Sequence, residues 1–195
     1  MVPTCLSPHG FLRQLPAVLD GEPPPPEVVF VGYFDHYPNR DAIAWYLREV
    51  HDAVRARVPG YRLRVVGRGD PGAIRRDDPS VLWVGAVEDL AAALRAGRVG
   101  VAPIVSGTGM RGKLNQYAAA FRPVVSTRLG AEGLPYTDGK DILIADSGAA
   151  FADAVVRLLG DDALWRRLAS AARATATAAF DWAPHLAALE ALHVG

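Results

Sequence analysis

Short apolar runs alternate with amphipathic segments along this chain, and that alternation restricts the fold more than any other feature. Residues 28–31 form a continuous apolar run closed by Gly32, as expected of a strand buried on both faces of a parallel sheet. A helical stripe follows, because apolar residues recur at spacings of four, three, four and four at Ile43, Leu47, Val50, Val54 and Val58. We therefore predict one helix between Pro38 and Pro59.

The strand and helix unit then repeats. We predict strands at residues 61–66, 81–85, 99–103, 124–126 and 142–145, and helices at residues 88–96, 113–121, 148–159, 161–178 and 183–192. Asp161 and Asp181 are suited to cap the last two helices. The alternation predicts an α/β fold with a doubly wound, Rossmann-like parallel sheet in a single domain with C-terminal helices.

The domain boundaries follow from a change in pattern. Residues 1–26 lack sustained periodicity and end in four consecutive prolines, so we interpret them as a connector and a stiff spacer. Residues 27–180 form the predicted Rossmann-like domain, and residues 181–195 form a closing helix.

Composition excludes several classes of function. Lys and Arg total 21, as do Asp and Glu, so nothing favours binding to nucleic acid or anionic lipid. Cys5 is the only cysteine, which excludes an internal disulfide and favours a reducing compartment, and no Cys or His spacing suggests a metal site. We find neither a signal peptide pattern nor an apolar stretch near the ~20 residues that span a bilayer, and expect a cytoplasmic protein.

One glycine-rich turn is the candidate binding site. It joins the predicted strand at 99–103 to the predicted helix at 113–121, and ligands of open parallel sheets lie at such strand ends. Arg111 and Lys113 lie at the helix start, where the helix dipole disfavours cations unless an anion binds. Lys113 is also one of only two lysines, in a chain whose other basic residues are arginines. An anion site and a plain tight turn with solvated cations explain the spacing equally well.

Two common nucleotide motifs are missing. The chain has neither the P-loop spacing of glycines and lysine nor Gly-x-Gly-x-x-Gly after the first strand, which weakens the NTPase and dehydrogenase interpretations.

Several motifs in order resemble one family. They are Val29-Phe30-Val31-Gly32-Tyr33-Phe34-Asp35-His36-Tyr37-Pro38-Asn39, Gly107-Thr108-Gly109-Met110-Arg111-Gly112-Lys113, Pro123-Val124-Val125-Ser126-Thr127 and Leu129-Gly130-Ala131-Glu132-Gly133-Leu134. From about residue 27 to residue 182 the chain resembles the C-terminal, donor-binding domain of retaining GT-B glycosyltransferases of the group 1 family.

The resemblance implies a nucleotide-diphosphate sugar as substrate, with no separate cofactor. Its diphosphate is expected on Gly107, Thr108, Gly109, Met110, Arg111 and Lys113, its ribose at Gln116, and its base at Gly85, Ala86 and Val87. His36 and Glu132 are candidates for contact with the sugar. A helix-capping loop is the stronger interpretation for His36, and a solvated turn is the alternative for Glu132.

The chain also departs from the family pattern. Members generally carry a glutamate where this chain has Gln116, and many carry an acid where it has Thr108. Because charge-assisted hydrogen bonds are about twice as strong as neutral ones, we expect donor binding weaker by roughly 1 to 2 kcal/mol. Phe121 replaces a small residue that often closes this helix, and we expect overpacking there. We place His51 on the polar side of its helix, as a surface histidine.

The resulting prediction is the donor half of a glycosyltransferase of hexosyltransferase type, active once a separate N-terminal domain or chain supplies the acceptor site. No catalytic residue is assigned. A non-catalytic, degenerate module acting with a partner chain and a Rossmann-like nucleotide binder of another kind are the alternatives.

Overall fold

The structure is a computed structural model that describes residues 15, 19, 21–107 and 112–180. Its six strands form one parallel sheet in the order β3-β2-β1-β4-β5-β6. The strands are β1 (Glu27–Val31), β2 (Arg62–Val66), β3 (Val81–Gly85), β4 (Val99–Ala102), β5 (Val124–Ser126) and β6 (Leu143–Ile144). The predicted Rossmann-like α/β fold is confirmed.

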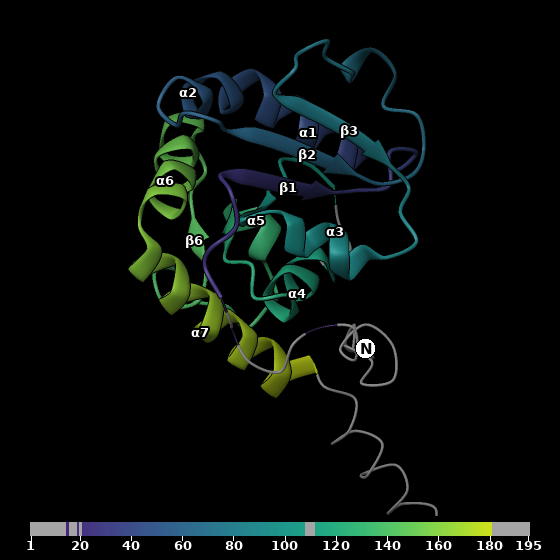
Figure 1. The fold of residues 1–195 in the computed structure, drawn as a ribbon. Coiled ribbons are helices and arrows are strands. Elements are labelled where there is room, and N and C mark those ends of the chain that lie inside the picture. Colours follow the sequence, from purple (N-terminus) through teal and green to yellow (C-terminus); the bar gives the residue numbers. More distant parts are fainter. Residues whose placement is uncertain (1–14, 16–18, 20, 108–111, 181–195) are drawn as a thin grey trace, which may run out of the picture.

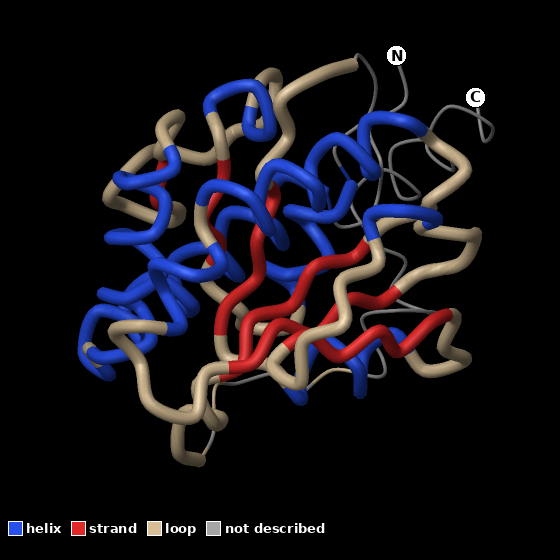
Figure 2. The backbone as a smooth tube through the Cα atoms, turned by 90° about the horizontal axis from the view of Figure 1, so that it is seen from above, coloured by secondary structure: helices blue, strands red, loops and turns tan. Residues whose placement is uncertain are grey.

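Helices cover both faces of the sheet, as seen along the sheet in Figure 1 and from above in Figure 2. One layer holds α1, α2 and α6, and the other holds α3 and α4. The helices are α1 (Tyr37–Glu49), α2 (His51–Arg55), the 3-10 helix η2 (Gly72–Ile74), α3 (Leu90–Ala96), α4 (Gly112–Ala119), α5 (Arg128–Ala131), α6 (Gly148–Gly160) and α7 (Asp162–Phe180).

Alternate residues of β1 face opposite layers. Val28 and Phe30 pack in the core beneath α1 and α6, whereas Val29 packs in the core beneath α4, and all three are at most 1% exposed. Burial on both faces explains why this strand is a continuous apolar run.

The long helix α7 belongs to both layers. Trp165 and Leu168 pack in the core of the α1 and α6 layer, whereas Ala172 and Ala176 pack in the core of the α4 layer. Figure 1 shows α7 running from the end of α6 to the far side of α4. Asp161 caps this helix as predicted, since its Oδ1 accepts a hydrogen bond from the Leu164 amide at 2.9 Å. The predicted helix at 183–192 and the cap at Asp181 lie outside the described residues.

The prediction of a single helix between Pro38 and Pro59 is wrong. The backbone leaves helical geometry at Val50, where φ is −122°, and separates α1 from α2. His51 is then fully buried and not on the surface. Its Nδ1 lies 3.2 Å from the Tyr61 hydroxyl and its Nε2 3.1 Å from the Ser80 hydroxyl.

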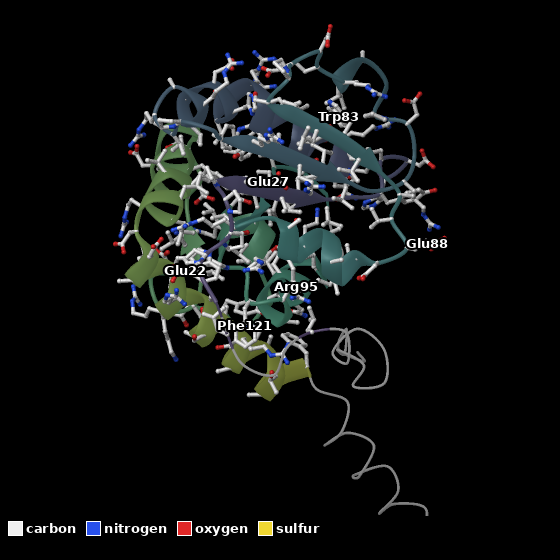
Figure 3. The ribbon with its side chains drawn as sticks, in the orientation of Figure 1. Glu22, Glu27, Trp83, Glu88, Arg95 and Phe121 are labelled. Atoms are coloured by element: carbon white, nitrogen blue, oxygen red, sulfur yellow. The ribbon has the colours of Figure 1, made fainter. Side chains whose placement is uncertain are left out.

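Phe121 is accommodated by an unusual backbone conformation. Its φ of 54° is left-handed, which costs a residue with a side chain roughly 1 to 2 kcal/mol. The ring is 5% exposed, and the Arg173 guanidinium lies 5.3 Å from its centroid. Figure 3 labels Phe121 beside α7. The ring therefore lies against α7.

Arg122 ties the end of α4 to the end of α3. Its guanidinium donates to the carbonyl oxygens of Leu94 at 3.3 Å and of Arg95 at 3.2 Å, which lie in the last turn of α3. A cation is favourable at a helix C-terminus, although burial and the neighbouring Arg95 lower the pKa of Arg122 to about 10.

Within the described residues, no helix is long and apolar enough to cross a membrane.

Candidate functional site

The candidate site is the end of the sheet between β1 and β4, beyond their paired residues, which we call the crevice. Strand β1 pairs with β2 on one side and β4 on the other, so the winding of the sheet reverses there. Pairing of β1 with β4 is limited to Val28 with Val99 and Val29 with Gly100. Beyond these pairs the strands part, and open parallel sheets bind their ligands at such a switch point.

Tyr117 of α4 fills the base of this crevice. Its hydroxyl accepts a hydrogen bond from the Val31 amide at 2.8 Å and donates one to the Val101 carbonyl at 3.3 Å. Burial raises the pKa of Tyr117, so the hydroxyl keeps its proton. A Cβ on Gly100 would lie 2.5 Å from the Tyr117 ring, so only glycine allows this approach.

The loop after β4 packs against the start of α1. Gly107 has a left-handed φ of 86°, and a Cβ there would overlap the Pro38 ring. Ser106 donates a hydrogen bond from its hydroxyl to Asp41 of α1. Ser106 and Gly107, the first residues of the predicted phosphate turn, therefore pack against the start of α1.

Lys113 points its ammonium into the same region. Its Nζ donates to Asn39 Oδ1 at 2.7 Å and lies 4.7 Å from the centroid of the Phe30 ring. Burial lowers the pKa of Lys113 to about 7. Among the residues described, no carboxylate forms an ion pair with it. A cation in neutral, partly desolvated surroundings gains from the arrival of an anion.

The other predicted diphosphate contacts cannot be compared with the structure, since Thr108, Gly109, Met110 and Arg111 lie outside the described residues. Gln116, the predicted ribose contact, is partly exposed on α4 one turn beyond Lys113.

The predicted base contacts follow β3. Gly85 and Ala86 are exposed, and the Gly85 carbonyl accepts a hydrogen bond from the Gly67 amide at 2.8 Å. Val87 packs at the edge of the core that contains Leu114 of α4. This loop therefore belongs to the α3 and α4 side of the sheet, two strands away from β1.

The two candidate sugar contacts lie apart in the fold. His36 is exposed and precedes α1 as its N-cap residue, but its side chain makes no capping hydrogen bond. Glu132 is exposed at the end of α5, in the wall of a cavity of about 500 Å³ that Arg128, Tyr136 and Asp146 also line. His36 thus lies in the loop before α1, whereas Glu132 lies after β5, at the end of α5.

Sequence reasoning missed Asn39 and Tyr117 near the crevice, and Asn115 of α4, which contacts Tyr136. Asn115 is 1% exposed, its Oδ1 accepts a hydrogen bond from the Tyr136 hydroxyl at 2.9 Å, and its Nδ2 has no partner. A signal existed for Tyr117, because Gly100 interrupts an otherwise branched apolar strand and such a glycine often marks the close approach of another group.

A second polar cluster joins α2 to the segment before β3. Its residues His51, Asp52 and Asp78 approach one another within 4.8 Å. Hydrogen bonds from Ser80 and the positive charge of Arg55 lower the pKa of Asp78 to about 2. Arg55 and Arg76 pair with both carboxylates. Both carboxylates are therefore engaged in ion pairs with arginines, and this arrangement does not favour a metal ion.

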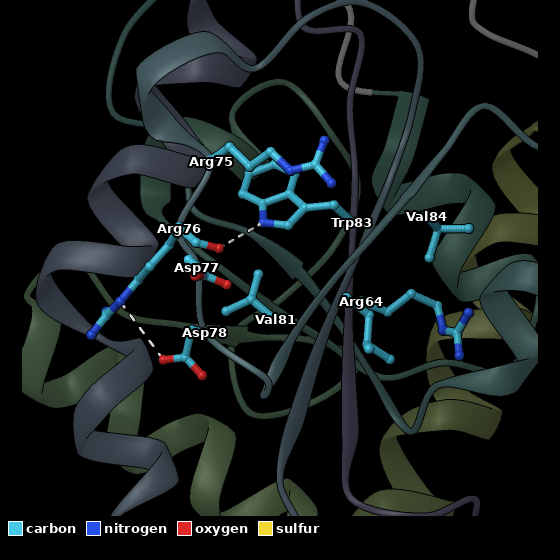
Figure 4. A pocket seen from close by; sticks show the side chains of 9 residues that line it. Arg64, Arg75, Arg76, Asp77, Asp78, Val81, Trp83 and Val84 are labelled. Carbon is cyan, nitrogen blue, oxygen red and sulfur yellow. Dashed lines mark hydrogen bonds and ion pairs between the residues drawn. The ribbon is translucent and has the colours of Figure 1, made fainter.

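A cavity of about 670 Å³ lies beside this cluster, at the outer edge of β3. Figure 4 shows the side chains that line it. Trp83 lies in its wall and donates from Nε1 to the Arg76 carbonyl at 3.4 Å. Strands β2 and β1 separate this cavity from β4, so it is distinct from the crevice.

Comparison with known proteins identifies the family. Residues 25–161 match the model of the glycosyl transferases group 1 family, and the chain belongs to this family. A phosphatidyl-myo-inositol mannosyltransferase of Mycobacterium leprae (strain TN) is 36% identical over 129 residues, which are 62% of this chain and 34% of the relative. The chain spans about a third of the length of the curated relatives it matches.

Two solved structures share the fold. A TarM variant of S. aureus, in complex with fondaparinux, alpha-GlcNAc-glycerol and UDP, has a TM-score of 0.72 at 17% identity and covers 89% of this chain and 36% of its own. The C-terminal domain of a glycosyl transferase group 1 family protein, LpcC of Francisella tularensis, has a TM-score of 0.65 at 15% identity and covers 81% of this chain and 88% of its own.

Proposed function

We propose that this chain is the donor-binding half of a retaining GT-B glycosyltransferase. The observation that carries the proposal is Lys113, whose ammonium has the neutral amide of Asn39 as its hydrogen-bond partner, at the start of α1, where Gly107 packs against the neighbouring Pro38. The substrate would be a nucleotide-diphosphate sugar, and no further cofactor is required.

The arrangement suits the departure of a nucleoside diphosphate. Lys113 and the amides at the start of α4 would hold the diphosphate, together with Arg111 from the adjoining turn. When the bond from the sugar to the diphosphate breaks, negative charge grows on the leaving oxygen, and fixed cations stabilise that charge.

An N-terminal acceptor domain, in this chain's full protein or in a partner, would complete the active site. Two comparisons support this division: the similarity to LpcC extends over 88% of an isolated C-terminal domain, and the curated relatives are about three times as long as the matched region. In this proposal the acceptor site and the acid or base groups belong to that N-terminal domain.

A degenerate binding module is the second candidate, and Gln116 favours it. An amide accepts weaker hydrogen bonds from ribose hydroxyls than the carboxylate usual at this position. Such a chain would bind nucleotide sugars without transferring them.

Calorimetric titration with UDP-, GDP- and ADP-sugars tests the donor site. We expect the sugars of one nucleotide class to bind, and we expect Arg111→Ala and Lys113→Ala to lower the affinity for them. Failure of all three to bind the unaltered chain would refute the donor site, and equal binding by both variants would remove the cations from it. Sugar transfer measured in the presence of the proposed N-terminal acceptor domain distinguishes the enzyme from the degenerate module.

A further inference from the structure

Asn39 connects three segments at the mouth of the crevice. It lies in the first turn of α1, and its Oδ1 accepts a hydrogen bond from Lys113 Nζ, 74 residues further along the chain. Its Nδ2 donates to the carbonyl of Tyr33 at 3.0 Å, in the loop after β1. Both ends of the amide are therefore fixed, and its orientation is determined.

Both partners of the Lys113 ammonium among the described residues are neutral. The amide oxygen of Asn39 lies on one side, and the ring of Phe30, which is fully buried, lies beneath it. An aromatic face attracts a cation without cancelling its charge. The nearest acid along α1 is Asp41, which is engaged by the Ser106 hydroxyl. Within the described residues Lys113 forms no ion pair, so no carboxylate there cancels its charge.

We propose that Asn39 is the positioning residue of the diphosphate site: its amide orients the Lys113 ammonium toward the crevice and leaves the charge free for the nucleoside diphosphate of the donor. This inference rests on the proposed donor site and adds a residue from a separate segment to it. A carboxylate at this position would hold the ammonium equally well but would neutralise it and repel the diphosphate.

The two lysines of the chain make the contact directly observable. Lysine labelled with ¹³C at Cε gives two side-chain signals, and Lys140→Arg assigns the one that belongs to Lys113. In Asn39→Asp we expect the titration midpoint of the Lys113 signal to rise by about one pH unit or more, because the new carboxylate favours the charged amine. In Asn39→Leu it should not rise.

Binding is measured with whichever of UDP, GDP and ADP binds the unaltered chain most tightly, and with its nucleoside. We expect Asn39→Asp to weaken the diphosphate by about tenfold or more and Asn39→Leu by several-fold, with the nucleoside unaffected in both. Arg40→Gln is the matched control, since it changes the net charge by the same amount in the same turn of α1.

Two results would overturn the assignment of Asn39. One is an unchanged Lys113 titration in Asn39→Asp, and the other is equal weakening by Asn39→Asp and Arg40→Gln. If the unaltered chain binds a nucleoside diphosphate in either case, the proposed function stands and Asn39 alone is wrongly assigned. If none of the three diphosphates binds, the proposed function fails and this inference fails with it.

Discussion

The hydroxyl of Tyr117 lies 2.8 Å from the amide nitrogen of Val31, where β1 and β4 have already parted. A side chain from α4 therefore supplies a hydrogen bond that the strand pairing no longer provides. The same hydroxyl reaches Val101 of β4, so one phenol links both strands at the base of the crevice.

Tyr117→Phe should lower the free energy of unfolding by about 1 to 3 kcal/mol, because the Val31 amide loses its buried partner. Urea denaturation measures the change. Tyr37→Phe removes a hydroxyl from a ring that is 54% exposed and should leave stability unaltered. Equal stabilities of the two variants would show that the bridge contributes nothing.

Gly107→Ala should weaken nucleotide binding by about tenfold or more, because the new Cβ overlaps Pro38 and displaces the loop after β4. Gly133→Ala is the control: its φ of 74° is similarly left-handed, but a Cβ there meets nothing within 4 Å. Both variants carry backbone strain from a left-handed φ. A loss of affinity in Gly107→Ala alone would therefore be due to the overlap with Pro38. Comparable losses would contradict this account.

Nucleotide binding should take up a proton above neutral pH. Burial lowers the pKa of Lys113 to about 7, so the free amine is mostly neutral at pH 8.5, and a bound diphosphate restores its charge. Affinity should then fall by up to about tenfold per pH unit above pH 7. Calorimetry in two buffers of different ionisation enthalpy measures the number of protons taken up on binding. Lys113→Arg should abolish this uptake. A wild-type titration without uptake would refute the burial of this amine.

The same shift in Lys113 affects stability in a defined direction. The unfolded chain holds the proton up to the usual pKa of 10.5, whereas the folded chain releases it near 7. The contribution of Lys113 to stability therefore rises as the pH increases from 7 to 10.5.

His51 should make the domain less stable in mild acid. Burial lowers the pKa of His51 below its usual 6.5, so only the unfolded chain gains the proton as the pH falls through that value. We expect the free energy of unfolding to decrease by about 1 kcal/mol per pH unit below pH 6.5. Urea denaturation between pH 7.5 and 5.5 measures this slope. His51→Asn should flatten it, whereas substitution of the exposed His36 by Gln should not.

Gln116→Glu should raise donor affinity by about 5- to 30-fold, because a carboxylate accepts stronger hydrogen bonds from ribose hydroxyls than an amide. Titration with the nucleotide sugar measures the gain, and the free base lacks the ribose and serves as the control ligand. An unchanged affinity would mean that Gln116 does not contact the ribose.

The sheet was predictable because burial on both faces leaves a strong local signature. Runs such as residues 28–31 contain nothing polar, and the predicted strands agree with the structure within one or two residues. The break at Val50 has no such signature, since a valine there continues the apolar stripe. His51 nevertheless lies four residues after Leu47 and three before Val54, a spacing that places it beside the buried stripe.

The site was only partly predictable. The glycine turn and Lys113 are adjacent in sequence, so their motif identified them. Asn39 contacts the Lys113 ammonium 74 positions away, and Tyr117 contacts the Val31 amide 86 positions away. No local pattern indicates which distant group a given amide or phenol will meet.

The course of α7 has a consequence for how the chain is made. Trp165 and Leu168 belong to one core, whereas Ala172, Ala176 and Phe180 belong to the other. The first core therefore lacks members until residue 168 has left the ribosome, and the second lacks them until residue 180 has. Segments released earlier expose apolar surface on both sides of the nascent sheet. Folding during synthesis should therefore be a single late event, and a stalled ribosome would present an aggregation-prone intermediate to chaperones.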